Sequence, residues 1–367
     1  MRIFLSGTSF RPSYGGPARS VSRLALALAA NGIDVGVWAP DQSAEDTEFL
    51  GDDSRVRRLW GTVEEALENF GSPDVIHDNG IWLRHNHRLA VLARNRGIPR
   101  LVSTRGMLEP WAMSHKRLKK KLAWWLYQKS DLAGASCHHA TASQEGRGLD
   151  RFGWKVPICR IPNGVDMPEV PVRAPDAAGL RTALFVGRLY PVKGLPLLIE
   201  AWARVRPAGW RVCLVGPDEG GHRAELEALV KQVNLAGVFE FTGSLRCEAL
   251  ERAYAQADLF VLPSHTENFG MVIGEAMARR LPVLTTRGTP WELLEHENCG
   301  WWVPVSVDGI ASALADATRR SAAELAGMGL RGQRIVSERY GWGKIAREFA
   351  ACYEWLLGEG RKPDFVT

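Results

Sequence analysis

Short apolar segments with the length and composition of buried β-strands alternate with helical patterns along almost the whole chain. In the first half these segments are RIFLSG, DVGVWAP, DVIHDNG, RLVSTRG, HATASQ and ICRIPNG, and in the second half ALFVGRL, VCLVGP, FEFTG, DLFVLPS, PVLTTRG and WWVPV. The stretches between them, such as residues 18–30, are amphipathic or rich in Ala and Leu. Strands that alternate with helices form parallel sheets covered on both faces. The sequence therefore predicts an α/β protein with doubly wound sheets.

The chain is long enough for two domains. Its 367 residues exceed the size at which one hydrophobic core usually stops growing. Residues 161–182 contain four prolines and show little periodicity, as linkers do. We predict a first domain at residues 1–168, a linker at 169–181, a second domain at 182–340 and a final helical segment at 341–367. Doubly wound sheets bind ligands at the carboxyl ends of their strands, so we expect the active site in a cleft between two facing domains.

The composition is that of a soluble globular protein, with 46% hydrophobic and 24% charged residues. No apolar run approaches the roughly 20 residues that a membrane-spanning helix needs. The opening, MRIFLSGTSF, reads as a buried strand rather than a signal peptide, so we expect a cytoplasmic protein. The six cysteines lie far apart without metal-binding spacing, which predicts reduced thiols and no metal centre. His85 and His87 are two residues apart and do not share a helix face.

Positive charge is concentrated in the first half. Residues 1–168 contain 23 Lys and Arg against 17 Asp and Glu, a net charge of +6, whereas the remainder has a net charge of −1. The densest stretch is SHKRLKKKLAWWLYQK, residues 114–129. Because the basic residues cluster on one predicted helix, we expect no nucleic-acid partner. The helix is either a solvated face or a surface for anionic lipid or a phosphorylated substrate.

A helical projection divides this basic stretch into two faces. Leu118, Leu122, Trp125 and Leu126 form one apolar stripe, which we expect to pack against the domain. The cations lie opposite it or on its flanks: Lys116, Arg117, Lys119, Lys120 and Lys121. Trp124 and Tyr127 fall on the polar side, which is typical of rings at a bilayer interface. This face predicts peripheral binding to an anionic cytoplasmic membrane surface.

Two carboxylates in SHTENFGMVIGEAMARR stand out because of their surroundings. Glu267 comes after a buried strand and just before a helix that we expect to begin at Phe269 or Gly270. Glu275 lies inside the apolar part of that helix, where an unpaired carboxylate is costly to bury. The hydroxyls of a sugar would satisfy both. Alternatively, Glu267 complements the helix dipole and Glu275 pairs with an arginine.

Two strand-to-helix connections carry groups suited to phosphate. LFVGRLYPVKGLPLLIEAW places Arg188 and Lys193 between a buried strand and a helix, where two cations suit a diphosphate, although ordinary loop charges would look the same. Gly15 and Gly16 stand between a strand and a helix, and paired glycines there let backbone N–H groups approach phosphate or sugar oxygens. The spacing matches neither a dinucleotide-binding loop nor a P-loop.

Taken together, these motifs resemble the retaining glycosyltransferases of family 4, which have the GT-B fold of two facing Rossmann-like domains. The resemblance covers essentially the whole chain, through Gly15-Gly16, IPNGVD, FVGRLYPVKG, the E-x7-E pair Glu267 and Glu275, and CGWWVP. It implies that the first domain binds the acceptor and the second the nucleotide sugar, and that the final helix crosses back to the first domain.

The resemblance also implies a role for each matching residue. Arg188 and Lys193 would hold the diphosphate and stabilise its charge as it leaves. Glu267 and the backbone at Asn268, Phe269 and Gly270 would bind the donor sugar, and Glu275 the ribose. The sequence has no D-x-D triplet, so we expect metal-independent transfer without a cofactor.

One position departs from the family pattern. Where many relatives have a histidine after the strand LVSTRG, this chain has Arg105, which cannot act as a base because it stays protonated. Arg105 could bind phosphate or an acceptor group, or only anchor its loop. His77, His85 and His115 are candidates to replace the histidine.

The expected reaction is hexose transfer from a UDP-sugar, or a GDP-sugar, to a growing bacterial polysaccharide or lipid-linked glycan such as lipopolysaccharide. The alternatives are a sugar-nucleotide epimerase of the same fold and a non-catalytic glycan-binding protein, the latter suggested by 14 tryptophans. The motifs do not fix the donor or the acceptor. Asn268, at a position where many relatives have glycine, bears on the choice of sugar.

Overall fold

The computed structural model describes residues 1–45, 47–114, 117–169 and 179–367. Within them the chain forms two compact units, Met1–Gly164 with Trp342–Thr367 and Val165–Gly341. The first unit therefore ends before the expected boundary at residue 168, because the Val165 N–H donates to the Tyr340 carbonyl and its side chain joins the core of the second unit. Most of the expected linker, residues 170–178, lies outside the described residues.

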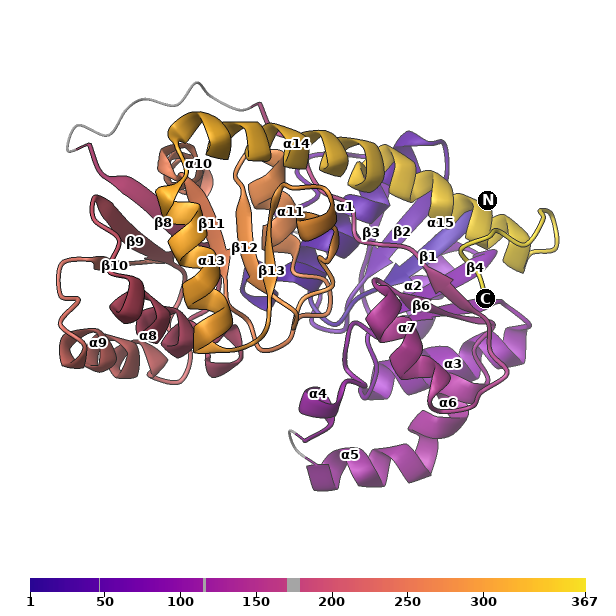
Figure 1. Cartoon of the computed structure of the whole chain (residues 1–367). Coiled ribbons are helices and arrows are strands. Elements are labelled where there is room, and N and C mark those ends of the chain that lie inside the picture. The colour runs from indigo at the N-terminus through magenta and orange to yellow at the C-terminus, as the bar shows by residue number, and fades with distance from the viewer. Residues whose placement is uncertain (46, 115–116, 170–178) are drawn as a thin grey trace. The chain divides into compact units, whose positions relative to one another are not determined.

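The first unit is built on a seven-stranded parallel sheet in the order β3-β2-β1-β4-β5-β6-β7 (Figure 1). Its strands are β1 (Arg2–Ser6), β2 (Asp34–Trp38), β3 (Val56–Leu59), β4 (Val75–Asn79), β5 (Arg100–Ser103), β6 (Cys137–Ala140) and β7 (Ile158–Arg160). Six of them fall within or next to the apolar segments that the sequence indicates. The strand β3 was not expected, because Arg57 and Arg58 break its apolar pattern and only Val56 and Leu59 are buried.

Helices cover both faces of this sheet. Alternate residues of β1 point to opposite faces, so Ile3 and Leu5 join one core cluster and Phe4 joins another. The first cluster is covered by α1 (Gly16–Ala30) and α15 (Trp342–Leu356), and the second by α2 (Val63–Phe70) and α3 (Arg84–Arg96). The last segment of the chain thus completes the core of the first unit, and Gly164 leaves room there for the ring of Trp342.

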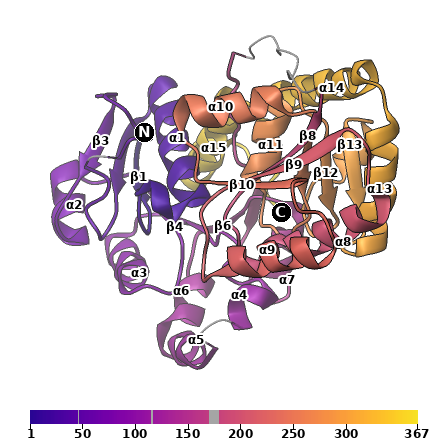
Figure 2. The same ribbon diagram turned by 90° about the vertical axis from the view of Figure 1, so that its left-hand side faces the viewer.

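Shorter helices surround the remaining strands of the first unit. They are the 3-10 turn η1 (Pro12–Tyr14), α4 (Pro110–Ser114), α5 (Arg117–Ala123), the π-helical turn η2 (Trp124–Gln128), α6 (Lys129–Ala133) and α7 (Ser143–Asp150). In both views α5 lies at the outer edge of this unit, beyond α4 and α6 (Figures 1 and 2). No helix within the described residues is long and apolar enough to cross a membrane.

The second unit repeats the scheme with a six-stranded sheet in the order β10-β9-β8-β11-β12-β13. Its strands are β8 (Arg181–Val186), β9 (Trp210–Val215), β10 (Phe239–Gly243), β11 (Leu259–Leu262), β12 (Val283–Thr286) and β13 (Gly300–Val303), all parallel. Each of them overlaps a segment that the sequence predicts as a strand, although β8 and β9 begin two residues earlier and β13 one residue earlier. The α/β, doubly wound fold class is confirmed for both units.

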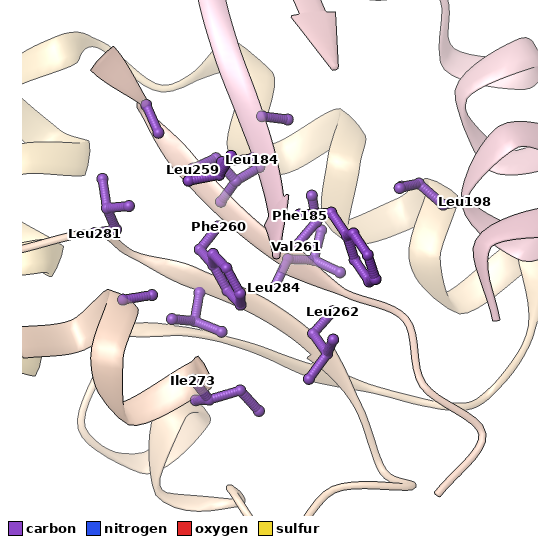
Figure 3. Close-up of a cluster of buried hydrophobic side chains, with 14 of the residues drawn as sticks. Leu184, Phe185, Leu198, Leu259, Phe260, Val261, Leu262, Ile273, Leu281 and Leu284 are labelled. Carbon is purple, nitrogen blue, oxygen red and sulfur yellow. The ribbon is translucent and has the colours of Figure 1, made fainter. Parts of the chain in front are cut away.

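Helices on both faces of the second sheet enclose a continuous apolar core. They are η3 (Pro191–Lys193), α8 (Leu195–Val205), α9 (His222–Gln232), α10 (Cys247–Gln256), α11 (Met271–Ala278), α12 (Leu293–His296), α13 (Val307–Arg319) and α14 (Ala322–Tyr340). Figure 3 shows side chains of the central strands, such as Leu184, Phe260 and Leu284, together with Leu198 from α8 and Ile273 from α11. Because β8 and β11 are buried on both faces, their carboxyl ends form a rigid base for the loops that follow.

Candidate functional site

Both sheets have a switch point. There, the connections that follow two neighbouring strands run to opposite faces of the sheet. In the first unit it lies between β1 and β4, and in the second between β8 and β11. Open α/β sheets bind ligands just outside the strand ends at this point. The predicted site residues of each unit follow these strands in sequence, so the topology brings residues distant in sequence to one edge.

In the second unit the switch point holds a lysine and a glutamate in direct contact. Lys193 Nζ lies 2.5 Å from Glu267 Oε1, and both side chains are largely buried. The Ser264 hydroxyl donates to the same carboxylate oxygen over 2.7 Å. Within the described residues Glu267 Oε2 accepts no hydrogen bond, so it can accept one from a ligand hydroxyl. The arrangement holds a cation and a free carboxylate oxygen side by side.

Close backbone packing fixes this pair in place. Gly194, next to Lys193, has φ +66°, and a Cβ atom there would lie 2.1 Å from the Pro263 carbonyl oxygen at the end of β11. The Glu267 N–H donates to the Gly288 carbonyl over 2.8 Å. Glycine at position 194 therefore permits the approach of η3 to β11 that brings the lysine to the glutamate.

Arg188, the second predicted cation, lies in the same loop but has another partner. Its guanidinium donates to Glu219 Oε2 over 2.7 Å, and both side chains are substantially exposed. Exposed ion pairs of this kind contribute little stability, about 0–1 kcal/mol. The guanidinium can therefore exchange Glu219 for a phosphate at small cost.

The other half of the E-x7-E pair lies deeper in the fold. Glu275 is 7% exposed on α11, and the Tyr254 hydroxyl donates to its Oε2 over 3.4 Å. The nearby Arg279 donates to the Glu275 backbone carbonyl and forms an ion pair with Glu251, and its charge also interacts with the Glu275 carboxylate. An arginine therefore lies beside Glu275 and is shared with Glu251.

The segment between the two glutamates leads into the helix α11. It begins at Met271, after Gly270 in the left-handed region with φ +76°. Phe269 is buried, and its carbonyl accepts a hydrogen bond from Trp291 Nε1 over 2.5 Å. Asn268, which precedes it, is half-buried. The helix thus starts one or two residues later than the sequence predicts, and its N-terminus is held by an aromatic cluster.

In the first unit the switch point contains a small cavity beside Arg105. The loop after β1, including Thr8 and Phe10, forms one side of it, and Asn79 at the end of β4 and Met107 contribute the other. Tyr14 also lines it, and the exposed Gly15 and Gly16 follow at the start of α1, where Gly15 has φ +81°.

Arg105 is half-buried among neutral partners. Its guanidinium donates to Asn79 Oδ1 over 2.6 Å and to Asn163 Oδ1 over 2.9 Å. Its Nε is buried without a hydrogen-bond partner, and no carboxylate of the described residues lies within ion-pair distance. Burial lowers the pKa of this guanidinium to about 10, so it stays charged at neutral pH. Arg105 thus connects the loop after β5 to Asn79 and Asn163, which belong to other segments.

Three supporting residues were not singled out from the sequence. Asn79 and Asn163 follow the strands β4 and β7, where DVIHDNG and IPNG already place polar groups at strand ends. Glu145 is buried at the start of α7 and accepts hydrogen bonds from the Thr104 hydroxyl and the Gly106 N–H. It fixes the backbone on both sides of Arg105, whose φ of +53° is unusual for a residue other than glycine.

The histidine His77 is not available as a replacement base. It is fully buried, and its ring nitrogens contact the Tyr353 hydroxyl and the Ser103 hydroxyl, each over 2.7 Å. Ser103 in turn contacts His139 Nδ1 over 2.6 Å, and His139 Nε2 donates to the Ile161 carbonyl. Because that carbonyl can only accept, each hydrogen bond in the chain runs from Tyr353 towards Ile161 and both rings are neutral.

The other two histidine candidates are also constrained. His85 packs edge-on against Trp38, and burial lowers its pKa. His115 lies outside the described residues. His87, which does not share a helix face with His85, contacts Asp131 Oδ2 over 2.8 Å.

The basic segment faces the opposite way from the prediction. Leu118, Leu122, Trp125 and Leu126 point into solvent instead of packing on the domain. Trp124 packs against Trp82, Phe152 and Trp154. The π-helical turn and this aromatic cluster decide which face is buried. Arg117, Lys119 and Lys121 are exposed beside the apolar stripe, whereas Lys116 lies outside the described residues.

The sequence spacing of the cysteines did not reveal one cluster. The sulfur atoms of Cys137, Cys159 and Cys352, from β6, β7 and α15, lie within 4.8 Å of one another in the core of the first unit. Among the described residues they are the one group with ligand atoms close enough for a metal. They lie in the core and not at the switch point.

Two doubly wound domains with a cation-rich strand edge in one of them define a class of enzymes that act on nucleotide-linked groups. Family models narrow this class. Residues 15–164 match the glycosyl transferase 4-like domain and residues 181–320 match glycosyl transferases group 1. The chain belongs to the glycosyltransferases of family 4, with the GT-B fold.

Individual proteins agree with this assignment. The chain is 27% identical to the GDP-mannose-dependent alpha-mannosyltransferase of Mycolicibacterium smegmatis, over 98% of each chain. It is 29% identical to the GDP-mannose:cellobiosyl-diphosphopolyprenol alpha-mannosyltransferase of Xanthomonas campestris, over 100% of each chain. The structure of sucrose-phosphate synthase from Thermosynechococcus elongatus superposes with a TM-score of 0.78 at 24% identity, covering 98% of this chain and 99% of that one.

Proposed function

We propose that this glycosyltransferase transfers a hexose with retention, without a metal ion, from a nucleotide sugar to a growing polysaccharide or a lipid-linked glycan. The contact of Lys193 with Glu267 at the switch point of the second unit is the observation that carries the proposal. It places a cation for phosphate next to a carboxylate for sugar hydroxyls.

The donor is proposed to bind the second unit through groups of complementary charge. Arg188 and Lys193 bind the diphosphate, and both stabilise the negative charge that grows as the glycosidic bond breaks. Glu267 Oε2 and the backbone at Asn268, Phe269 and Gly270 bind the hexose. A carboxylate suits this role because it accepts hydrogen bonds from two hydroxyls and does not compete for the phosphate.

Glu275 is proposed to bind the ribose of the nucleotide. Its nearly buried, ionised carboxylate is a strong hydrogen-bond acceptor, and the two hydroxyls of a ribose diol suit such an acceptor. The two glutamates then recognise the two sugars on either side of one diphosphate.

Retention without a metal ion requires no basic side chain. The leaving phosphate itself accepts the proton of the acceptor hydroxyl as the new bond forms on the face that the diphosphate leaves. Arg188 and Lys193 neutralise the charge of the diphosphate, as a divalent ion does in other enzymes.

Arg105 is proposed to bind an anion at the first unit, either the leaving phosphate or an acidic group of the acceptor. The support is its environment: a charged guanidinium held by two neutral amides, with one N–H unused and a cavity beside it. Gly16, at the start of α1, contributes its backbone N–H group to the same side, whereas the Gly15 N–H donates to the Pro12 carbonyl.

The relatives bear on the donor and the acceptor. Two proteins that match almost the full length are named for GDP-mannose, so we favour GDP-mannose over the UDP-sugar that the sequence motifs suggested. One of them is named for an acceptor linked to diphosphopolyprenol, which supports a lipid-linked acceptor here. Such an acceptor would bring the reaction to a membrane surface.

A donor screen followed by product analysis tests the proposal. GDP-mannose and UDP-glucose are compared by thermal shift, and transfer to a lipid-linked oligosaccharide is followed by NMR, which reports the anomeric configuration. We expect the Glu267→Ala variant to bind nucleotide but not to transfer, while Glu295→Ala, an exposed glutamate of α12, behaves as wild type.

Three results would contradict the proposal. Unchanged transfer in Glu267→Ala would remove its central residue. A product of inverted configuration would exclude retention, and activity lost in EDTA and restored by magnesium or manganese would exclude metal independence. An epimerised nucleotide sugar formed without acceptor would instead identify the enzyme as an epimerase.

A further inference from the structure

The outer helix of the first unit exposes a row of large apolar side chains. Leu118, Leu122, Trp125 and Leu126 are 84%, 63%, 72% and 70% exposed, and within the described part of the chain they are the four most exposed large apolar residues. Their spacing of i, i+4, i+7 and i+8 places them on one side of the helix formed by α5 and η2. We call this row the apolar stripe.

The opposite side of the same helix is fixed to the domain. The Tyr127 hydroxyl donates to the Trp82 carbonyl over 2.8 Å, and the Trp82 N–H donates to Gln128 Oε1 over 2.7 Å. Trp124 stacks in the aromatic cluster, and Lys120 donates to the Ala112 carbonyl over 2.6 Å. With these four residues turned inward, the apolar stripe cannot rotate into the core.

The surroundings of the apolar stripe carry charge of one sign. Residues 110–130 contain six Lys and Arg and no Asp or Glu. Arg117, Lys119 and Lys121 are exposed, and Lys129 Nζ lies 5.8 Å from the centre of the Trp125 ring. The next acidic residue, Asp131, is buried and contacts His87.

We propose that the apolar stripe inserts into the interfacial region of an anionic bilayer. The three leucines enter the boundary between headgroups and acyl chains, Trp125 lies at headgroup depth, and the cations contact lipid phosphates. A second copy of this chain is the less suitable partner, because two such surfaces would bring their cations together. The proposed lipid-linked acceptor gives the reason why this enzyme would bind a membrane, and the proposal rests on the proposed function in that respect alone. Lipid binding itself does not require transfer.

Vesicle sedimentation tests the proposal with matched variants. We expect wild-type protein to bind phosphatidylglycerol-rich vesicles at low salt and to ignore phosphatidylcholine vesicles. The triple variant Leu118→Ser, Leu122→Ser, Leu126→Ser should lose affinity by roughly tenfold or more, because the apolar area that enters the interface is removed. Its control is Leu330→Ser, an exposed leucine of α14 in the second unit.

The charge contribution is tested separately. The double variant Lys119→Glu, Lys121→Glu should also lose binding, whereas Arg361→Glu, Lys362→Glu, at exposed cations near the C-terminus, should not. Salt should weaken wild-type binding without abolishing it, because insertion is not screened.

Insertion itself is read from tryptophan fluorescence. Brominated phosphatidylglycerol should quench part of the wild-type signal, and Trp125→Phe should lose that part when it is compared at a lipid concentration that binds both proteins. Equal binding by the serine variant, or no quenching, would overturn insertion. If the wild-type protein forms dimers and does not bind vesicles, and the serine variant is monomeric, the apolar stripe serves self-association.

The outcomes do not depend on the proposed transfer reaction. The serine variant should show the wild-type thermal shift with nucleotide, because its substitutions lie in the first unit, whereas Lys193 and Glu267 belong to the second. Failure of lipid binding with intact transfer would refute only the membrane surface. Failure of transfer with intact lipid binding would refute only the proposed reaction.

Discussion

Replacing Gly194 by alanine should destabilise the second unit through one atomic overlap. The residue has φ +66° and ψ +21°, and a Cβ atom there would lie 2.1 Å from the Pro263 carbonyl oxygen. That carbonyl ends β11, and the neighbouring Lys193 contacts Glu267. The overlap can be relieved only by moving η3 away from β11, which also separates the lysine from the glutamate.

The magnitude follows from two separate terms. The left-handed conformation costs a residue with a Cβ atom roughly 1–2 kcal/mol. Forcing an additional group into a packed site typically costs about 1–3 kcal/mol more. The Gly194→Ala variant should therefore lose roughly 2–5 kcal/mol of unfolding free energy in the second unit.

Gly209→Ala is the matched control for this substitution. Gly209 lies in the same unit with φ +73°, and a Cβ atom there meets nothing within 4 Å. It should lose only the conformational term, roughly 1–2 kcal/mol. Hydrogen exchange of β8 and β11 peptides at increasing urea concentration measures the unfolding free energy of the second unit by itself. Equal stability of the two variants, within about 0.5 kcal/mol, would refute the role assigned to the close approach.

Three further predictions concern the first unit. Arg105→Lys should lower transfer by roughly tenfold or more, because an ammonium group cannot reproduce a planar guanidinium held at two points; unchanged transfer would exclude an active role. Glu145→Ala should cost roughly 3 kcal/mol or more in urea unfolding of the first unit and also reduce transfer, since the Thr104 and Gly106 donors lose their acceptor; a loss below about 1 kcal/mol would contradict this. Burial lowers the pKa of His139 to about 3, so below pH 6.5 the unfolded chain binds a proton that the folded chain does not, and stability should fall as pH falls from 6.5 towards 3; the contribution is on the order of 2–3 kcal/mol at pH 4.5, and it should disappear in His139→Gln.

The strands were predictable where both faces are buried. The strand LFVL is a continuous apolar run and the strand VIHDN is buried along its whole length, because helices cover both sides of their sheets. The strand β3 lies at the edge of its sheet, where only one neighbour is needed and Arg57 and Arg58 remain exposed or half-exposed. The strand β3 forms because it pairs with β2, and this pairing cannot be predicted from the local sequence.

The basic helix shows where helical periodicity stops being informative. Its projection grouped Leu118, Leu122, Trp125 and Leu126 correctly but assigned that group to the interior. Burial of an apolar stripe is the usual outcome, and here it was overridden by the aromatic pocket that receives Trp124 and by the hydrogen bonds of Tyr127. Such partners are distant in sequence, so no local pattern could identify the buried face.

The candidate site was predictable in position but not in pairing. Strand ends located Arg188, Lys193 and Glu267, because the topology of a doubly wound sheet brings them to one edge. The contact of Lys193 with Glu267 spans 74 positions and depends on the backbone approach at Gly194. The amide partners of Arg105 were missed for the same reason, since each lies after a different strand.

The pairing of Lys193 gives the substitution Glu267→Gln opposite effects on two measured quantities. Removing the negative charge leaves the lysine without its counter-ion and removes a repulsion on the incoming diphosphate, so the affinity for a nucleoside diphosphate should rise, by roughly three- to tenfold if the effective dielectric constant is that of water, about 80. Transfer should fall, because an amide binds the sugar hydroxyls less strongly than a carboxylate does. Calorimetry with GDP and a transfer assay measure the two quantities. If the pair serves only to stabilise the fold, both should be unchanged at temperatures where the variant is folded, and that result would refute a role for Glu267 in the reaction.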